Sequence, residues 1–174
     1  YAHAQRLYNY ASSCWFMFST PILSNGGTSR GLPISCFLNF VPDSRHGLSD
    51  HYDENIWLAS AGGGVGGYWG AVRSNGTGTT NGSKSTGSIP FMHVVDSQML
   101  AFNQGVTRRG SYAAYMDVSH PEIEEFIAMR KTTGGDLNRK CLNLHNAVNI
   151  TNEFLDAVRD DLSWRLIDPK TKTA

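Results

Sequence analysis

The stretch Ile34-Ser35-Cys36-Phe37-Leu38 is a short apolar run bounded by turn-forming residues, and it predicts a β-strand. Asp43-Ser44 follows it and offers an N-cap for a helix that runs toward Ser60. A further helix is expected over 90–102, and a further strand over 112–116. Because strands and helices alternate along the chain, we expect an α/β fold.

Apolar residues at three- and four-residue spacing predict the buried faces of the helices in the first two thirds of the chain. In residues 1–18 this spacing predicts a helix that Thr20-Pro21 ends, and 24–28 then form a turn-rich loop. The residues expected on the buried faces of this helix and of helix 90–102 are Leu7, Tyr10, Ala11, Cys14, Phe18, Phe91, Val94, Val95 and Phe102.

The last third of the chain shows further helix and strand signals. The segment 119–122, Ser-His-Pro-Glu, has the spacing of a capping box and predicts the start of a helix. A loop is expected over 132–136, a strand over 147–150, and a final helix capped by Thr151. The residues expected to face inward from these two helices are Ile123, Phe126, Ile127, Phe154, Leu155 and Val158.

Composition limits the class of protein. Hydrophobic residues make up 40% of the 174 residues, enough for a buried core. The 15 basic and 15 acidic residues balance, which argues against a protein that coats nucleic acid. No apolar run is long enough to cross a bilayer, and the histidines and cysteines lack metal-ligand spacing. Three cysteines without a CxxC pair indicate a reducing compartment, so we expect a cytoplasmic protein with no metal of its own.

Glycine is concentrated in the middle of the chain, where ten of the 18 glycines lie between Gly62 and Gly87. Between Gly62 and Ser111, the only acid is Asp96, whereas several cations are present. Such a region fits a small anionic ligand, with backbone N–H groups and Arg73 forming a phosphate cradle. Tight turns alone would also explain the glycines. A dinucleotide-binding motif would need an acid for the ribose, and a Walker A loop would need Gly-Lys-[Ser/Thr]; neither is present.

The polar segment 103–110 is a second candidate for ligand contact. An Asn or Gln amide offers a donor and an acceptor together and can read the edge of a base. An Arg guanidinium stacks on planar rings and binds phosphate. A solvated connecting loop would have the same composition, so this alternative stays open. The candidate residues are Asn103, Gln104, Gly105, Arg108 and Arg109.

The segment around Cys36 holds the other candidate groups. A cysteine in an apolar strand is either an inert core residue or a reactive thiol, and its type alone does not decide between them. The hydroxyls of Thr20 and Ser35 and the backbone at Gly63 and Gly64 could bind phosphate oxygens, because small groups allow close approach. The same residue types are also common in turns.

Read together, these segments closely resemble the large, catalytic subunit of class I (aerobic) ribonucleotide reductase, and they cover nearly the whole chain in order. The segments that carry the resemblance are Phe18–Thr28, Arg30–Asn39, Asn55–Ser60, Ser88–Phe91, His120–Phe126, Thr133–Asp136 and Asn143–Ile150. The resemblance implies an internal fragment of that subunit. Residues 1–174 would form a single segment in which 1–19 end an N-terminal helical region.

The family resemblance also implies an architecture. Residues 20–174 would form the first part of a ten-stranded α/β barrel of the ribonucleotide reductase and glycyl-radical type, including both specificity loops. The helix after Asp43 would lie at a dimer face.

By position, the resemblance implies a role for each candidate residue. Cys36 would be one of the two cysteines that are oxidised when the ribose is reduced. Thr20, Ser35, Gly63 and Gly64 would hold the substrate's phosphates. At the allosteric effector site, Asp43 would bind the effector's sugar, and Arg73, in the first specificity loop, would bind its phosphates. The residues implied for the second specificity loop are Asn103, Gln104, Gly105, Arg108 and Arg109.

The resemblance further implies ligands and partners. The substrate would be a ribonucleoside diphosphate, the effector ATP or a deoxynucleoside triphosphate, and the reductant thioredoxin or glutaredoxin. A homodimer would assemble with a small subunit that carries the metal-radical cofactor, so that no cofactor binds this chain directly. No segment resembles the loop with the radical-forming cysteine, so we expect this chain alone to be inactive. The alternative is a non-catalytic nucleotide-binding module that acts with a partner chain.

Overall fold

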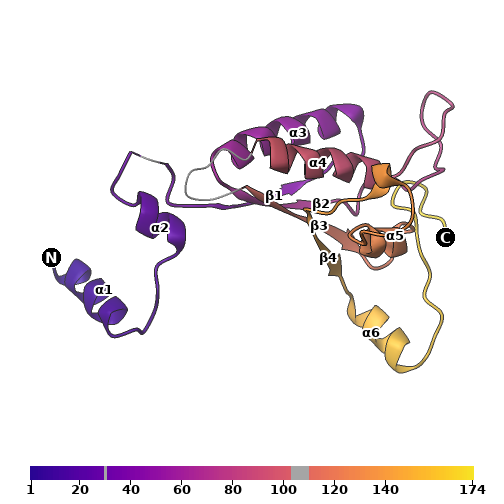
Figure 1. The fold of residues 1–174 in the computed structure, drawn as a ribbon. Coiled ribbons are helices and arrows are strands. Elements are labelled where there is room, and N and C mark those ends of the chain that lie inside the picture. Colours follow the sequence, from indigo (N-terminus) through magenta and orange to yellow (C-terminus); the bar gives the residue numbers. More distant parts are fainter. Residues whose placement is uncertain (30, 103–109) are drawn as a thin grey trace. The chain divides into compact units, whose positions relative to one another are not determined.

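A computed structural model describes residues 1–29, 31–102 and 110–174. The chain divides into two compact units, Tyr1–Ser35 and Cys36–Ala174, and each is described by itself. The first unit holds the helices α1 (Ala2–Ser12) and α2 (Thr20–Asn25), which are drawn in indigo in Figure 1.

The first unit differs from the expectation in two ways. Helix α1 ends at Ser12 and buries none of its residues, so the predicted buried face that extends to Phe18 is wrong. Cys14 lies beyond the helix with a φ of 60° and is exposed. Thr20-Pro21 opens α2 instead of ending a helix, because a proline in the first turn gives up an N–H that would have no helical partner.

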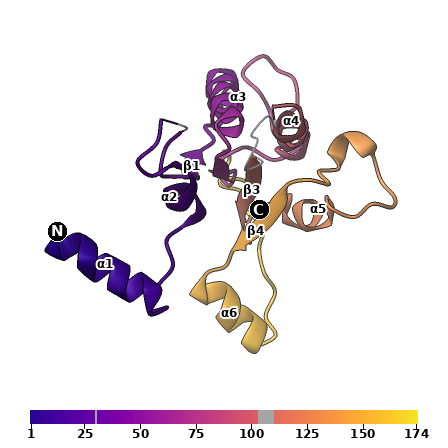
Figure 2. The same cartoon turned by 60° about the vertical axis from the view of Figure 1, so that its left-hand side comes forward.

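The second unit is built on a four-stranded sheet in the order β1-β2-β3-β4, with every neighbouring pair parallel. The strands are β1 (Cys36–Phe40), β2 (Gly64–Tyr68), β3 (Ser111–Asp117) and β4 (His145–Asn149). The connections and the C-terminal segment hold α3 (Arg45–Ser60), α4 (Ile89–Ala101), α5 (Ile123–Ala128), the 3₁₀ helix η1 (Leu137–Arg139) and α6 (Asn152–Arg159). This parallel sheet with crossover helices confirms the predicted α/β fold (Figures 1 and 2).

The predicted elements are present with shifted ends. Strand β1 begins at Cys36, two residues after the predicted start, and β4 begins at His145. The N-caps were correct: the Ser44 hydroxyl accepts from the Gly47 N–H at 3.0 Å, and the Thr151 hydroxyl accepts from the Phe154 N–H at 3.3 Å. The predicted capping box is absent, because the Glu122 carboxylate accepts instead from Ser88.

The interpretation of the glycine-rich stretch as tight turns is wrong for residues 64–68, because Gly64–Tyr68 forms β2 between β1 and β3. Large neighbours fill the space that its missing side chains leave. A Cβ at Gly66 would lie 2.7 Å from Leu38 Cδ2 and 3.1 Å from a ring carbon of Tyr115. The ladder on both sides and this packing offset the low strand propensity of glycine.

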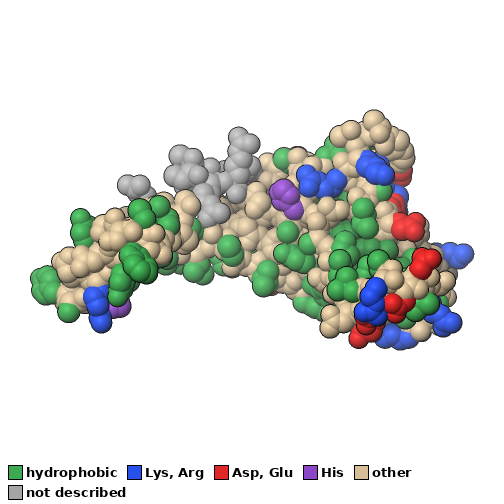
Figure 3. All heavy atoms as spheres, turned by 90° about the horizontal axis from the view of Figure 1, so that it is seen from below, with side chains coloured by type: hydrophobic (Ala, Val, Ile, Leu, Met, Phe, Trp, Pro, Cys, Tyr) green, Lys and Arg blue, Asp and Glu red, His purple; other side chains and the backbone are tan. Residues whose placement is uncertain are grey.

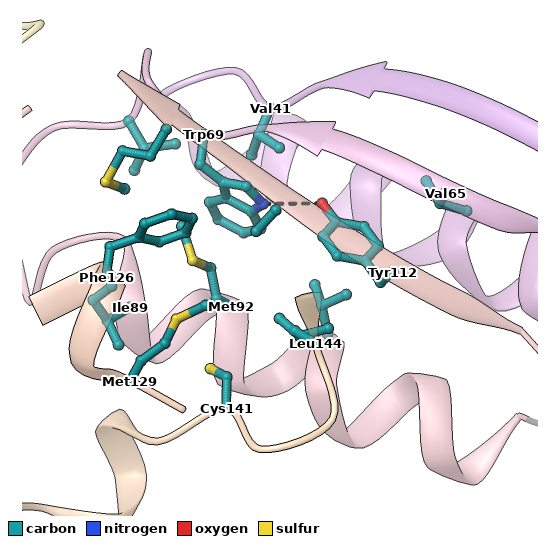
Figure 4. Packing of buried hydrophobic residues seen from close by; sticks show 14 of the residues in the cluster. Val41, Val65, Trp69, Ile89, Met92, Tyr112, Phe126, Met129, Cys141 and Leu144 are labelled. Carbon is teal, nitrogen blue, oxygen red and sulfur yellow. Dashed lines mark hydrogen bonds between the residues drawn. The ribbon is translucent and has the colours of Figure 1, made fainter. Parts of the chain in front are cut away.

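The hydrophobic core lies on the face of the sheet that α3, α4 and α5 cover. Figure 4 shows Trp69 beside Tyr112, with Phe126 and Met92 on the other sides of the indole, and the Trp69 indole N–H donates to the Tyr112 hydroxyl at 2.9 Å. The core residues were only partly predicted from helical spacing. Within the second unit, five residues expected to face inward are exposed instead: Val94, Phe102, Ile127, Leu155 and Val158.

Exposed hydrophobic side chains remain on the second unit. Leu38 is 84% exposed on β1, and Trp57 is 70% exposed on α3. Figure 3 shows hydrophobic side chains at the surface in the view from below. In the described parts of the chain, no helix combines the length and apolar character needed to cross a membrane.

Replacing Gly67 by alanine is expected to lower the free energy of unfolding by about 3 kcal/mol. The new Cβ would collide with the Tyr112 hydroxyl and come within 3.0 Å of Asn39 Oδ1, so the buried Trp69–Tyr112 pair would have to move. Urea unfolding of the purified variant measures the loss. Gly78→Ala is the matched control, because nothing lies within 4 Å of a Cβ there; an equal loss in both variants would contradict the packing argument.

The buried imidazole of His51 predicts a pH-dependent stability. Its Nε2 lies 3.0 Å from the Tyr112 hydroxyl and 2.9 Å from Asn55 Nδ2, whereas Nδ1 has no hydrogen-bond partner within the described residues. Burial lowers the pKa of His51 from 6.5 to about 4. Between these values the unfolded chain binds a proton that the folded chain does not. The free energy of unfolding should therefore fall by about 3 kcal/mol as the pH drops from 6.5 to 4.

Urea unfolding at several pH values from 4 to 7 measures this slope, with His51→Gln as the comparison. The variant should lose this part of the pH dependence, because glutamine does not titrate. Parallel pH profiles of the two proteins would show that the His51 pKa is not depressed in the folded state.

Candidate functional site

Cys36 lies at the start of β1, on the face of the sheet opposite the one that α3, α4 and α5 cover. Its neighbour Phe37 packs against the core, so Cys36 points to the opposite face and is exposed. The strand register places Cys36 beside Gly64 and Gly64 beside Ser111. These three residues begin their strands together, and we call this edge of the sheet the thiol edge. It presents a sulfur next to a residue without a side chain, which leaves room for a ligand to approach.

Gly63 and Gly64, the two glycines predicted to bind phosphate, have different backbone environments. The Gly63 N–H donates to the Leu58 carbonyl at 2.8 Å, and the Gly63 carbonyl accepts from the Ser111 N–H at 3.4 Å. A Cβ at Gly63 would lie 2.9 Å from the Leu58 carbonyl oxygen, so glycine is required for this turn into β2. Gly64 is half-buried and lies beside Cys36. The structure thus brings Cys36 and both glycines together, and the Gly63 amide is already used within the turn.

The same face of the sheet carries a polar cluster near the other end of the strands, which the sequence did not indicate. The Tyr68 hydroxyl donates to Asp117 Oδ2 at 2.5 Å, and Asn149 Nδ2 donates to Asp117 Oδ1 at 3.0 Å. Burial, together with the hydrogen bond and charge of Asp117, raises the pKa of Tyr68 to about 12. Tyr68 therefore stays a neutral hydrogen-bond donor at neutral pH, and the cluster fixes the arrangement of β2, β3 and β4.

A separate cleft of about 560 Å³ lies between the start of α3 and the segment that follows β2. At one side of the cleft, Arg73 Nε lies 2.9 Å from Asp43 Oδ2, and the Arg73 backbone N–H donates to Asp43 Oδ1 at 3.3 Å. The Arg73 guanidinium also donates to the Gly78 carbonyl at 2.9 Å. The structure therefore brings Asp43 and Arg73, two residues predicted from different segments, to one site.

Three further cations line this cleft: Arg45, Lys84 and Lys170. Within the described residues none of them forms an ion pair, whereas the charge of Arg73 is balanced by Asp43. Helix α3 also begins here, so the positive end of its dipole faces the cleft region. The hydroxyl-bearing residues of the lining are Ser44, Thr79, Thr80, Ser83, Ser85 and Thr86. The cationic cleft can thus hold an anion and offer hydrogen bonds to a polar ligand.

One wall of the cationic cleft is a hairpin formed by residues 74–86, which extends from the body of the unit in Figure 1. Its strands are joined by hydrogen bonds from Gly76 N–H to the Ser85 carbonyl at 2.9 Å and from Thr79 N–H to the Ser83 carbonyl at 2.8 Å. Gly78 and Lys84 form an isolated antiparallel bridge between them. Arg73 therefore connects Asp43, at one side of the cleft, with Gly78 in the hairpin wall.

Comparison with known proteins assigns the chain to a family. Residues 34–174 match the family model described as "Ribonucleotide reductase, barrel domain". The chain belongs to this ribonucleotide reductase family. A Frog virus 3 (isolate Goorha) protein, provisionally named ribonucleoside-diphosphate reductase large subunit, is 52% identical over 168 residues and is matched by 97% of this chain. The ribonucleoside-diphosphate reductase subunit alpha of Helicobacter pylori (strain ATCC 700392 / 26695) is 35% identical over 95% of the chain.

A solved structure is also similar to this ribonucleotide reductase segment. The class Id ribonucleotide reductase alpha subunit of Actinobacillus ureae matches 90% of the chain with 30% sequence identity and a TM-score of 0.73. The segment spans 28% of the Frog virus 3 relative, 21% of the Helicobacter pylori relative and 28% of the Actinobacillus ureae chain. The comparisons therefore establish the family of the segment, which corresponds to a part of a longer subunit in these relatives.

The other predicted site residues of this ribonucleotide reductase segment lie elsewhere. Thr20, at the start of α2, and Ser35 belong to the first unit, so their phosphate-binding role stays a prediction. The second-loop residues Asn103, Gln104, Gly105, Arg108 and Arg109 lie outside the described residues, and their role also stays a prediction. In the described ranges, no group of three or more His, Cys, Asp or Glu side chains could hold a metal ion.

Proposed function

We propose that this chain is part of the large subunit of a ribonucleoside-diphosphate reductase, with Cys36 as one of its two redox cysteines. The position of Cys36 carries this proposal. Its sulfur is exposed at the thiol edge, beside Gly64 and on the face of the sheet opposite α3, α4 and α5. An inert core cysteine would instead be buried among apolar side chains, as Cys141 is.

The proposed reaction converts a ribonucleoside diphosphate into its 2′-deoxy form. Two thiols supply two electrons and two protons, the ribose hydroxyl leaves as water, and the two sulfurs form a disulfide. Cys36 would supply one of these thiols, and thioredoxin or glutaredoxin would reduce the disulfide again. The radical that starts the reaction would come from a cysteine outside this chain, fed by the metal-radical cofactor of a separate small subunit, so this chain would be inactive alone.

The cationic cleft is the proposed site of the allosteric effector, ATP or a deoxynucleoside triphosphate. Arg45, Lys84 and Lys170, together with the hydroxyl lining, suit a polyanionic, polar ligand. Arg73 would meet the effector's phosphates, and Asp43 would accept from its sugar hydroxyls. A carboxylate has about four acceptor positions, so Asp43 can accept from a sugar while it remains paired with Arg73.

The proposed assembly explains the uncovered surfaces of the second unit. Strands β1 and β4 are the two edges of the parallel sheet and would continue into a ten-stranded α/β barrel with the rest of the large subunit. The exposed Trp57 on α3 and Leu100 on α4 suit a homodimer that packs these helices against a second copy. We place this assembly in the cytoplasm, in line with the reducing conditions that its thiols require.

Titration of the chain with ATP and each deoxynucleoside triphosphate tests the effector site. We expect saturable binding that weakens as salt is added, because the contacts are mainly ionic. Deoxyribonucleotide formation by the complete large subunit with its small subunit then tests the enzyme. Nucleotide binding without turnover in that assembly would favour the alternative, a non-catalytic nucleotide-binding module, because the cleft lies wholly within the second unit.

A further inference from the structure

We propose that Lys170, on the C-terminal turn 168–173, contacts the anionic groups of the ligand in the cationic cleft, and that Asp168 is the positioning residue that holds it there. This inference rests on the proposed function of the cleft as a nucleotide site. It adds a segment far along the chain to a site that Asp43 and the hairpin 74–86 would otherwise define.

One oxygen of Asp168 binds the base of the hairpin. Its Oδ2 accepts from the Ser74 N–H at 2.8 Å, from the Ser74 hydroxyl at 2.5 Å and from the Thr77 hydroxyl at 2.9 Å. Ser74 directly follows Arg73, so this contact lies next to the residue that pairs with Asp43 at one side of the cleft. The hairpin is therefore held at its base by two carboxylates, Asp43 through Arg73 and Asp168 through Ser74.

The other oxygen of Asp168 shapes the C-terminal turn itself. Its Oδ1 accepts from the Lys170 N–H at 2.8 Å and from the Thr171 N–H at 2.9 Å. The turn is closed by the Lys172 N–H, which donates to the Asp168 carbonyl at 2.9 Å. A single carboxylate thus joins the turn to the hairpin, and it sets where the Lys170 side chain leaves the backbone.

The Asp168 carboxylate stays charged in this position. It is only 5% exposed. Burial alone would raise the pKa of Asp168, but hydrogen bonds from Ser74, Thr171 and Thr77 outweigh it and hold the pKa well below its usual range. A buried carboxylate with this many donors is a rigid attachment point, because losing any one bond leaves a charged oxygen less satisfied.

Lys170 adds its charge to a site that already has an excess of positive charge. Its side chain lines the cleft together with Arg45 and Lys84, and within the described chain none of the three has an acidic partner. Like charges gathered around one cleft repel each other unless an anion enters. A triphosphate spreads negative charge over several oxygens, so it can satisfy cations on opposite walls at once.

Lys170→Ala tests the contact, and Lys172→Ala is the matched control. Lys172 has the same side chain two residues later, but it lines a different hollow of about 390 Å³ with Tyr68 and Asp117. Calorimetric titration of the full chain with ATP, and with inorganic tripolyphosphate, measures both variants. Lys170→Ala should bind both probes about tenfold more weakly, the loss expected for one charge-assisted hydrogen bond. Lys172→Ala should bind as the unmodified chain does.

Asp168→Asn tests the positioning role, because it keeps the shape of the side chain and removes its charge. We expect weaker binding of both probes and faster hydrogen exchange at the backbone amides of Ser74, Lys170 and Thr171. In the double variant with Lys170→Ala, the loss should be smaller than the product of the two single losses. If the double variant instead loses affinity by the full product of the two single losses, Asp168 does not act through Lys170.

The outcomes separate this inference from the proposed function. If the chain binds tripolyphosphate but not ATP, the cleft is not a nucleotide site. The affinity of Lys170→Ala for tripolyphosphate then still decides whether Lys170 contacts the anion. Binding of neither probe would overturn both. If Lys170→Ala and Lys172→Ala bind both probes as tightly as the unmodified chain, Lys170 is no contact residue.

Discussion

Cys36→Ser is expected to abolish ribonucleotide reduction by the complete enzyme, with deoxyribonucleotide formation lower by roughly three orders of magnitude or more. A serine hydroxyl cannot form the disulfide that delivers two electrons to the ribose. The sulfur at position 36 is exposed at the thiol edge, so the substitution changes the chemistry there without opening a cavity in the core. Product formation in the presence of a dithiol and the small subunit measures the effect.

Cys14→Ser is the control for this experiment, because Cys14 is also exposed but belongs to the first unit and has no proposed role in the reaction. It should leave the rate of turnover within about twofold. Turnover by Cys36→Ser at a rate close to that of the unmodified enzyme would remove Cys36 from the proposed redox pair.

Arg73→Ala should weaken binding of the nucleoside triphosphate by roughly 100-fold, because two effects add. The variant loses a guanidinium that would contact the phosphates. It also leaves the Asp43 carboxylate without its partner in the cleft, where that charge repels an anionic ligand. The Gly78 carbonyl loses its donor as well, so the hairpin wall is held less firmly. Calorimetric titration with ATP and the deoxynucleoside triphosphates measures the change.

Arg159→Ala is the matched control for Arg73. Arg159 also pairs with carboxylates, Asp156 and Asp160, but on α6 rather than in the cleft. The control should bind nucleotides normally. Equal affinities of Arg73→Ala and the unmodified chain would show that the effector binds elsewhere.

Locally encoded features of this fold were predictable from the sequence. The cap at Ser44 and the following helix α3 depend on contacts within a few residues, and so does the cap at Thr151. Strand β3 was also predicted almost to its ends, because its alternating buried residues leave a clear pattern. These elements suffice to establish an α/β fold.

Features that depend on distant neighbours were not predictable from local pattern. The glycines of Gly64–Tyr68 suggested tight turns, yet this segment is a strand because β1 and β3 provide hydrogen bonds on both sides. Helical spacing also placed Val94 and Leu155 inward, although both are exposed on the second unit. Their exposure suits faces that would pack against the remainder of a larger assembly.

Some residues of the candidate site could be predicted from the sequence, and others could not. Arg73 and Cys36 were candidates from the residues themselves, whereas the role of Asp43 came from the family resemblance; the structure gives Asp43 and Arg73 a shared cleft. Lys170 carried no signal in the sequence, because its role depends on a turn that Asp168 ties to the hairpin from far along the chain.

The redox state of Cys36 after one turnover tests the account most directly. The complete enzyme is mixed with a ribonucleoside diphosphate and effector without any external reductant, quenched with an alkylating reagent and analysed by peptide mass spectrometry. We predict that Cys36 is recovered in a disulfide in proportion to the deoxyribonucleotide formed. Deoxyribonucleotide formed while Cys36 is recovered fully alkylated would contradict the proposal.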